Sequence, residues 1–259
     1  MKAVILAGGL GTRIQEETYL RPKPMVEIGG MPILWHIMKI FYHYGVNEFI
    51  ICCGYKGYQI KEFFANYFHH MSDVTFDFEE KTTIIHKEWG EKWKVSLCNT
   101  GENSLTGERL KRVKRFLPDN EPFFLTYGDG VSDLNIRKLL SFHKKHRRLA
   151  TLTAVIPKAR FGALNIQGIS VISFQEKPKS SEGYVNGGFF ALHKEAVEFI
   201  TEDNESWEAR PLEQLSLSNE LAAFKHHGYW QAMDTLRDKI ELERLWESGN
   251  APWRVWDNI

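Results

Sequence analysis

The chain has 259 residues, which is long enough for one sizeable α/β core. Its 33 lysines and arginines are balanced by 33 aspartates and glutamates, so the formal net charge is zero at pH 7. This balance argues against binding to nucleic acid or to a membrane surface, because both depend on an excess of basic residues.

The first residues predict a buried strand that runs into an anion-binding loop. Residues 3–7 form a short apolar run rich in branched side chains, which is typical of a central strand in a parallel sheet. Gly8, Gly9 and Gly11 follow directly. Glycines at this density let the backbone turn sharply and present bare N–H groups to a ligand.

Polar side chains add to this loop the groups that a phosphate needs. Thr12 supplies a hydroxyl donor, Arg13 a planar cation and Lys23 a point charge. The whole stretch therefore predicts a phosphate cradle, and a simple glycine-rich turn is the weaker interpretation.

Two better-known phosphate-binding motifs do not fit. A dinucleotide fingerprint that starts at Gly9 would need its third glycine at position 14, where the chain has Ile14. The next apolar strand, residues 49–53, ends at Gly54 and not at the acid that binds a ribose. A P-loop needs Gly-x-x-x-x-Gly-Lys-Ser/Thr, and the sequence has no such string.

The following residues predict alternating helices and strands. Apolar residues at helical spacing begin after Pro32 and stop at Gly45, residues 49–53 form a strand, and residues 60–71 form a second helix. This order predicts parallel strands joined by right-handed crossovers. Ligands of such sheets bind at the carboxyl ends of the strands, where the glycine loop emerges.

The middle of the chain adds strands and a polar stretch. Apolar residues alternate with polar ones or cluster together, as is typical of strands, at residues 74–78, 82–87 and 94–98. Residues 100–112 are polar and basic, so they form either a ligand-contacting segment or a loop that enters a helix with a solvated face. Five of the ten histidines lack metal-ligand spacing and are predicted to be surface or packing residues. They are His69, His70, His86, His226 and His227.

A carboxylate ends the next buried strand. Residues 123–127 are apolar, and Asp129 follows between Gly128 and Gly130. An acid at the carboxyl end of a central strand is suited to Mg²⁺, which takes one or two carboxylates together with substrate phosphates. A turn or a helix cap is the alternative. Asp133 is predicted to be the N-cap of the helix that follows.

The second half predicts a mixture of strands and helices. The expected strands are residues 150–156, 161–164, 171–175 and 189–192, and the expected helices are residues 194–200, 207–217 and 235–246. Asp234 precedes the last helix, so it is either an N-cap or a second carboxylate for a metal. The tryptophans near the C-terminus, Trp253 and Trp256, pack on the domain or on another subunit.

Two short polar stretches of the second half are candidates for contact with a small polar ligand. Glu176 and Lys177 stand side by side before a proline, which by itself also fits an exposed ion pair. Asn186 and Gly187 offer an amide and an uncovered backbone, which suit close approach to a sugar.

These motifs together resemble a known family. Gly8-Gly-Leu-Gly-Thr-Arg13 followed by Pro22-Lys-Pro-Met25 is similar to the signature of sugar-1-phosphate nucleotidylyltransferases. The resemblance covers nearly the whole chain, and its later motifs suggest the cytidylyl branch. These later motifs are Thr100-Gly101, Thr106-Gly107 with Arg109, Tyr127-Gly-Asp-Gly130, Phe161-Gly-Ala-Leu164, Phe174-Gln-Glu-Lys-Pro178, Asn186-Gly-Gly-Phe-Phe190 and Met233-Asp-Thr235.

The resemblance implies a fold and a reaction. The fold would be α/β, a Rossmann-like, mainly parallel mixed sheet flanked by helices, with small β additions. Residues 1–259 would form one nucleotidyltransferase domain, with a nucleotide-binding half at about 1–130 and a sugar-binding half with the C-terminal helices at about 131–259. The substrates would be CTP and glucose 1-phosphate, the cofactor Mg²⁺ and the assembly a homo-oligomer. The product, CDP-glucose, would enter dideoxyhexose and O-antigen-type nucleotide-sugar synthesis.

The resemblance also assigns roles to individual residues. The groups implied as catalytic are Arg13, Lys23 and Asp129, and those implied as metal ligands are Asp129 and Asp234. The groups implied as substrate-binding are Leu6, Ala7, Gly8, Gly9, Leu10, Gly11, Thr12, Arg13, Lys23, Ser104, Arg109, Gly128, Glu176, Lys177, Asn186 and Gly187. In this scheme the loop wraps base and ribose, Ser104 and Arg109 lie near the nucleotide, Glu176 binds sugar hydroxyls and Lys177 binds the sugar phosphate.

Three other functions remain open at this point. A nucleotidylyltransferase of the same family could use another base or sugar. A nicotinamide-dependent oxidoreductase is opposed by the missing third glycine and ribose acid. A non-catalytic nucleotide-sugar sensor is opposed by the presence of both Asp129 and Asp234. The odd number of cysteines, the absence of a signal-peptide pattern and the lack of a run of about 18 apolar residues favour a cytoplasmic location.

Overall fold

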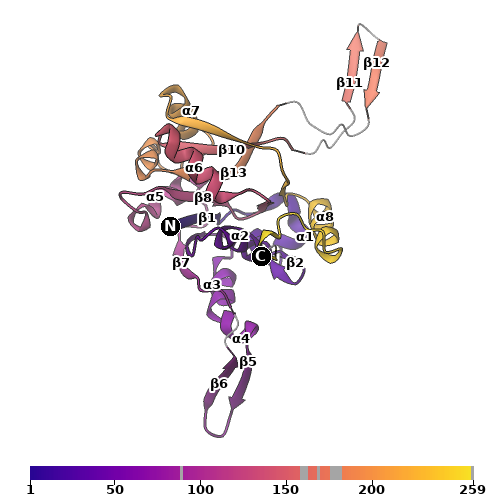
Figure 1. Cartoon of the computed structure of the whole chain (residues 1–259). Helices are drawn as coiled ribbons and strands as arrows, with labels where there is room; N and C mark the ends of the chain where they lie inside the picture. The colour runs from indigo at the N-terminus through magenta and orange to yellow at the C-terminus, as the bar shows by residue number, and fades with distance from the viewer. Residues whose placement is uncertain (88–89, 158–162, 168–169, 176–182, 258–259) are drawn as a thin grey trace.

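The computed structural model describes residues 1–87, 90–157, 163–167, 170–175 and 183–257 (Figure 1). In these parts of the chain, one central sheet has the strand order β14-β10-β13-β8-β1-β4-β7. In chain order its strands are β1 (Lys2–Ala7), β4 (Glu48–Cys53), β7 (Lys94–Asn99), β8 (Phe123–Tyr127), β10 (Ala150–Val155), β13 (Val185–Leu192) and β14 (Leu221–His226).

The sheet is mainly parallel, with one antiparallel strand. β1 pairs in parallel with both β4 and β8, and β4 pairs in parallel with β7. β13 runs antiparallel between β8 and β10, and β14 is parallel to β10 at the edge. Leu6 lies opposite Tyr127 in the register of β1 and β8. The glycine loop and the Gly128–Gly130 turn therefore emerge side by side at the carboxyl edge of the sheet, and the predicted α/β fold class is confirmed.

Helices cover both faces of this sheet. The helices are α1 (Gln15–Thr18), α2 (Ile33–His43), α3 (Gly57–Ala65), α4 (Tyr67–Met71), α5 (Thr106–Arg112), α6 (Ile136–His146), α7 (Arg210–Leu217) and α8 (Leu236–Glu247). Short 3₁₀ turns are η1 (Thr12–Ile14), η2 (Lys23–Met25), η3 (Lys114–Phe116), η4 (Lys194–Phe199) and η5 (Val255–Asp257). No helix in the described ranges is both long and apolar enough to cross a membrane.

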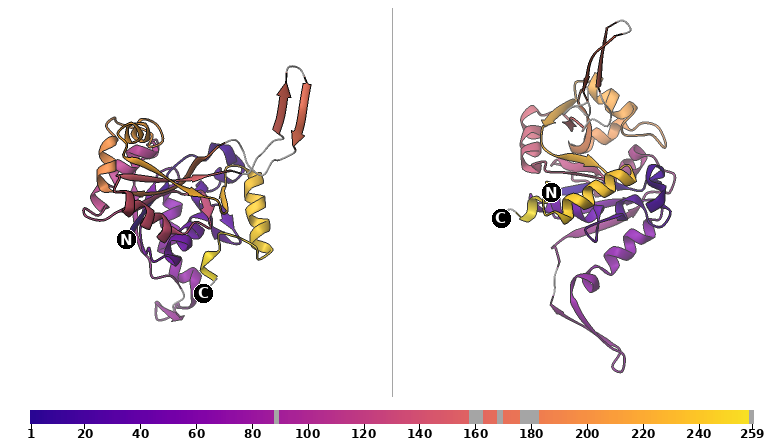
Figure 2. Two further views of the ribbon diagram at one scale, coloured as in Figure 1. Left: turned by 45° about the horizontal axis from the view of Figure 1, so that its top comes forward. Right: turned by 90° about the vertical axis from the view of Figure 1, so that its right-hand side faces the viewer.

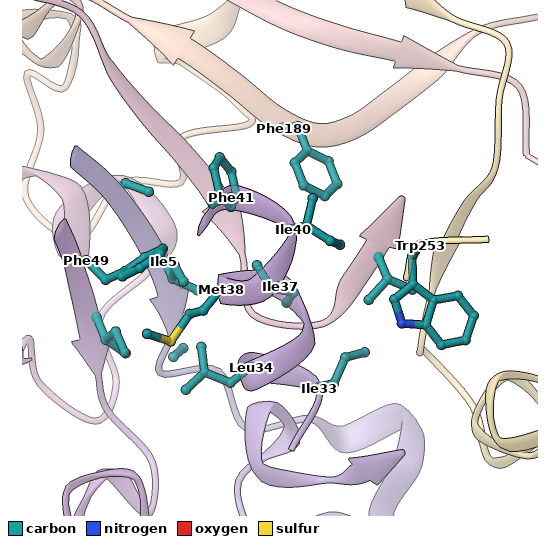
Figure 3. Packing of buried hydrophobic residues seen from close by; sticks show 14 of the residues in the cluster. Ile5, Ile33, Leu34, Ile37, Met38, Ile40, Phe41, Phe49, Phe189 and Trp253 are labelled. Carbon is teal, nitrogen blue, oxygen red and sulfur yellow. The ribbon is translucent and has the colours of Figure 1, made fainter. Parts of the chain in front are cut away.

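Alternation along the strands divides the core between the two faces. Ile5 packs with α2 on one face, where Phe41 and Phe189 stack with ring centroids 5.9 Å apart (Figure 3). Val4 and Leu6 point to the other face and pack with residues of α5, η4 and α7. Because both faces are covered, the strand that carries the glycine loop is almost completely buried and holds the loop on a rigid base.

Small hairpins extend the fold. β2 (Glu27–Ile28) pairs with β3 (Met31–Pro32), β5 (Asp73–Asp77) with β6 (Thr82–Lys87), β11 (Ala163–Gln167) with β12 (Ser170–Gln175), and β9 (Gly130–Ser132) with β15 (Trp230–Ala232). The β5–β6 and β11–β12 hairpins project from the body in different directions (Figures 1 and 2). The predicted small β additions are therefore present.

Several predicted boundaries were wrong. The single helix expected at residues 60–71 is broken at Asn66, which ends α3 and precedes α4. Residues 194–200 contain a 3₁₀ turn instead of an α-helix, and the helix expected from residue 207 begins at Arg210. The helix cap predicted at Asp133 belongs to Asn135, whose side chain accepts the backbone N–H of Lys138.

The beginning of α8 excludes the helix-cap interpretation of Asp234. Thr235 is the N-cap of this helix and forms a capping box with Asp238. Asp234 therefore stands outside the helix cap, and its carboxylate is available to the cleft described below.

The C-terminal tryptophans pack on their own domain. Trp253 is completely buried and its ring stacks on Tyr229, with centroids 5.7 Å apart. Trp256 contacts Trp35 of α2 edge to face at 5.7 Å. The alternative in which these residues cover another subunit is therefore not needed to explain them.

Candidate active site

A cleft of about 590 Å³ opens at the carboxyl edge of the sheet, between β1 and β8. Residues of both halves of the chain line it. The predicted site residues that line it are Leu6, Ala7, Gly8, Gly9, Gly11, Thr12, Arg13, Lys23, Ser104, Arg109, Gly128, Asp129, Asn186 and Asp234.

Four predicted residues are not among these lining groups. Leu10 is half exposed and does not line the cleft. Gly187 lies just behind the wall, where its carbonyl accepts the indole N–H of Trp230 at 2.7 Å. Glu176 and Lys177 lie outside the described residues.

Lys23 occupies the centre of the charged part of the cleft. Its Nζ donates to Oδ2 of Asp129 at 2.6 Å and to Oδ1 of Asp234 at 2.9 Å. Burial lowers the pKa of Lys23, but the two carboxylates outweigh burial and raise this pKa above its ordinary value. The side chain is therefore a permanent cation at neutral pH.

The pairing of two short strands brings the carboxylates together. Asp129 precedes β9 and Asp234 follows β15, and Gly130 lies opposite Ala232 in this pair. The backbone N–H of Met233 donates to the carbonyl of Asp129 at 2.9 Å. Asp129 and Asp234, which are more than a hundred positions apart in the sequence, therefore both accept a hydrogen bond from the ammonium group of Lys23.

Arg13 extends this charge cluster to the mouth of the cleft. Its Nη1 donates to Oδ2 of Asp234 at 2.9 Å, while the side chain remains 75% exposed. Such an exposed ion pair contributes little to stability. Arg13 can therefore exchange the carboxylate for an incoming phosphate at small cost.

Asp129 and Asp234 fit a divalent cation. Both carboxylates lie within hydrogen-bond reach of one cationic atom, Nζ of Lys23, so the pair already surrounds a positive charge. The described residues contain no cluster of three or more histidines, cysteines or acids that could hold a metal without further ligands. Two carboxylates completed by phosphate oxygens are the usual arrangement for Mg²⁺.

Arg109 ties the glycine loop to the segment before α5. It is only 3% exposed. Its Nη2 donates to the carbonyls of Gly8 at 2.9 Å and Glu102 at 3.0 Å, and its Nη1 donates to Oγ1 of Thr100 at 2.9 Å and to the carbonyl of Gly101 at 2.6 Å. In this structure the guanidinium thus holds the walls of the cleft in place.

The close approach of Arg109 explains why position 8 is glycine. A Cβ atom at Gly8 would lie 2.1 Å from Nη1 of Arg109, and one at Gly54 would lie 2.4 Å from the same atom. A side chain at position 8 would therefore displace the guanidinium of Arg109 from these hydrogen bonds.

Sequence reasoning did not identify several residues that line the cleft. These are Pro24, Leu105, Thr106, Tyr127, Ser206, Glu208, Trp230 and Ala232. Glu208 lies in an irregular segment between η4 and α7, where the sequence predicted part of a helix. Tyr127 was assigned to a buried strand and to one of the family motifs, but no role in the site was predicted for it.

The fold and the cleft are typical of α/β proteins that bind ligands at the carboxyl edge of the sheet. A family model described as nucleotidyl transferase matches residues 2–247. The chain therefore belongs to the nucleotidyl transferase family.

Individual relatives narrow this class. The chain is 58% identical to the glucose-1-phosphate cytidylyltransferase of Salmonella typhi, over 99% of this chain and 100% of the relative. It is 29% identical to the mannose-1-phosphate guanyltransferase of Yarrowia lipolytica, over 92% of this chain and 62% of that protein. A solved structure of UDP-glucose pyrophosphorylase has the same fold, with a TM-score of 0.67, 15% identity and coverage of 96% and 98% of the two chains.

Proposed function

We propose that the protein transfers the cytidylyl group of CTP to α-D-glucose 1-phosphate, which gives CDP-glucose and pyrophosphate. The observation that carries this proposal is the cluster of Lys23, Asp129 and Asp234 beside a glycine-rich anion loop. The choice of CTP and glucose rests on the full-length 58% identity to a glucose-1-phosphate cytidylyltransferase.

The reaction depends on electrostatic stabilisation of the phosphates more than on proton transfer. The second pKa of a phosphate monoester is about 6, so the sugar phosphate is already a dianion at neutral pH and needs no general base. Its oxygen attacks the α-phosphorus of CTP in line, and pyrophosphate leaves. The protein must hold two mutually repelling anions together and stabilise the charge that develops.

The charged residues divide this work. Arg13 faces the triphosphate, and Lys23 binds the α-phosphate or the leaving pyrophosphate. Asp129 and Asp234 would hold a divalent cation, for which we propose Mg²⁺. When bound, this cation would supply Lewis-acid stabilisation to the phosphate oxygens.

Backbone groups and further side chains position the two substrates. The backbone of residues 6–11 would enclose base and ribose, with Ser104 and Arg109 near the nucleotide. Asn186 and Gly187 would bind the sugar, and Glu176 and Lys177, which lie outside the described residues, are proposed for sugar hydroxyls and sugar phosphate. On this scheme residues 1–130 serve the nucleotide and residues 131–259 the sugar.

The substrate assignment is tested by pyrophosphate release with Mg²⁺, glucose 1-phosphate and each of CTP, UTP, dTTP, ATP and GTP. We expect release with CTP at least about tenfold faster than with any other triphosphate, which corresponds to about 1.4 kcal/mol of discrimination. Equal or faster release with another triphosphate would overturn the roles given to Ser104 and Arg109. Omission of glucose 1-phosphate is the control.

We also propose that the protein is a homo-oligomer that uses the β5–β6 hairpin. This hairpin projects from the body (Figure 2). Its apolar side chains Phe76, Phe78 and Ile84 are exposed. Two-stranded hairpins are marginally stable alone, so a second copy of the chain is a fitting cover.

Replacement of Phe76 and Phe78 together by serine is expected to shift the native mass toward the monomer. The paired control replaces Thr75 and Asp77 on the same strand by serine, because these residues are already polar. The measurement is light scattering after gel filtration. A parent protein that is monomeric, or an unchanged mass for the phenylalanine variant, would contradict this interface.

A cytoplasmic location completes the proposal. Cys52, Cys53 and Cys98 are all unpaired, which suits a reducing compartment. CDP-glucose formed there would be available to dideoxyhexose and O-antigen-type nucleotide-sugar synthesis.

A further inference from the structure

Glu208 is the acceptor of a polar network that crosses the wall of the cleft. Its Oε1 accepts the hydroxyl of Tyr127 at 2.5 Å. Its Oε2 accepts the hydroxyls of Thr106 at 2.5 Å and Ser206 at 2.8 Å. One carboxylate thus joins the end of β8, the start of α5 and the segment before α7.

The direction of these hydrogen bonds is fixed. A carboxylate can only accept, so all three hydroxyl hydrogens point toward Glu208. The oxygen of Tyr127 is therefore left as an acceptor, and it receives the amide N–H of Asn186 at 3.3 Å. The amide oxygen of Asn186 in turn accepts the backbone N–H of Gly188 at 2.9 Å.

The ring of Tyr127 lies against the backbone of β13. Gly188 has φ +77°, and a Cβ at this position would lie 2.4 Å from the ring of Tyr127. The ring is therefore packed directly on the strand that carries Asn186.

We propose that Glu208 is a positioning residue that sets selectivity for the sugar, because through Tyr127 it fixes the orientation of the Asn186 amide. This inference rests on the proposed function, in which Asn186 contacts the sugar. An amide held in one orientation presents its donor and its acceptor at defined places. The amide therefore distinguishes two epimers of a sugar, because only one epimer places its hydroxyl within hydrogen-bonding reach of the amide donor and acceptor.

The experiment compares Glu208→Gln, Tyr127→Phe and the double variant. Glutamine can donate where the carboxylate accepts, and phenylalanine keeps the packed ring but removes the hydroxyl. We expect each single variant to raise KM for glucose 1-phosphate about tenfold, as the loss of one well-placed hydrogen bond does, with KM for CTP changed less than about twofold. The preference for glucose 1-phosphate over galactose 1-phosphate should fall by a similar factor.

The double variant tests the route of the effect. If Glu208 acts through Tyr127, the double variant is no worse than either single one. If Glu208 instead contacts the sugar directly, Tyr127→Phe leaves KM for glucose 1-phosphate unchanged while Glu208→Gln raises it, and the proposal is overturned. Glu208→Asp should recover part of the affinity, because a carboxylate is restored.

Two controls separate this inference from other failures. Glu213→Gln alters an exposed glutamate in the first turn of α7, outside the cleft, and should leave both KM values unchanged. Binding of glucose 1-phosphate is also measured by calorimetry for every variant. If the parent protein binds glucose 1-phosphate but uses another triphosphate, the proposed function is wrong, and the role of Glu208 is still tested by the effect of the variants on sugar-phosphate binding. A parent protein that does not bind it would overturn both.

Discussion

Replacement of Lys23 by alanine is expected to lower the rate of pyrophosphate release at saturating substrates by a hundredfold or more. The ammonium is held in place before the substrates arrive, with Nζ at 2.6 Å from Asp129 and 2.9 Å from Asp234. Loss of one preorganised cation at a reacting phosphate costs on the order of 3 kcal/mol. The measurement is kcat with CTP, glucose 1-phosphate and Mg²⁺.

A second lysine provides the control for this variant. Lys138 is exposed on α6, so Lys138→Ala removes the same charge outside the cleft and should leave kcat unchanged. Thermal unfolding of Lys23→Ala shows whether removal of the ammonium between the two carboxylates disturbs the fold. If Lys23→Ala and Asp129→Ala each keep turnover within about threefold of the parent, the site assignment is wrong.

Neutralising the carboxylates is expected to have the second large effect, on metal dependence. Asp129→Asn and Asp234→Asn should each raise the Mg²⁺ concentration for half-maximal activity by at least about tenfold, because Mg²⁺ sites of this kind depend on one or two carboxylates. Each variant also leaves Lys23 with one anionic partner in place of two. A titration of activity against Mg²⁺ measures the change.

Direct metal binding supports the same prediction without turnover. Mn²⁺ binding in the presence of CTP, followed by electron paramagnetic resonance, should weaken in both variants. Asp73→Asn on the projecting β5 strand is the matched control, because this aspartate is exposed and lies outside the cleft. Unchanged Mn²⁺ affinity in both cleft variants would show that these carboxylates do not hold the metal.

The parts of the site that the sequence could predict are those formed by local residues. The glycine loop follows directly on β1, so the short stretch from Gly8 to Lys23 carried most of the signal. Asp129 was recognisable because it follows a buried strand. The interpretation of Asp234 stayed open, because only the pairing of β9 with β15 and the cap at Thr235 show that its carboxylate faces Lys23.

Other features depended on contacts that no local pattern contains. Arg109 was expected near the nucleotide, and the structure adds that its guanidinium donates a hydrogen bond to the carbonyl of Gly8. Glu208 was missed because it lies in an irregular segment, where neither strand nor helix periodicity marks a residue that faces the cleft. Its partners Thr106 and Tyr127 are distant in sequence, so the network exists only in the folded chain.

The most direct test of the central claim is a crystal structure of the protein with CDP-glucose and Mn²⁺. We predict the cytidine against the glycine loop, the diphosphate beside Lys23, the glucose beside Asn186, and an anomalous Mn²⁺ peak between Asp129 and Asp234. Density for the nucleotide sugar outside this cleft, or a Mn²⁺ peak away from both carboxylates, would contradict the account.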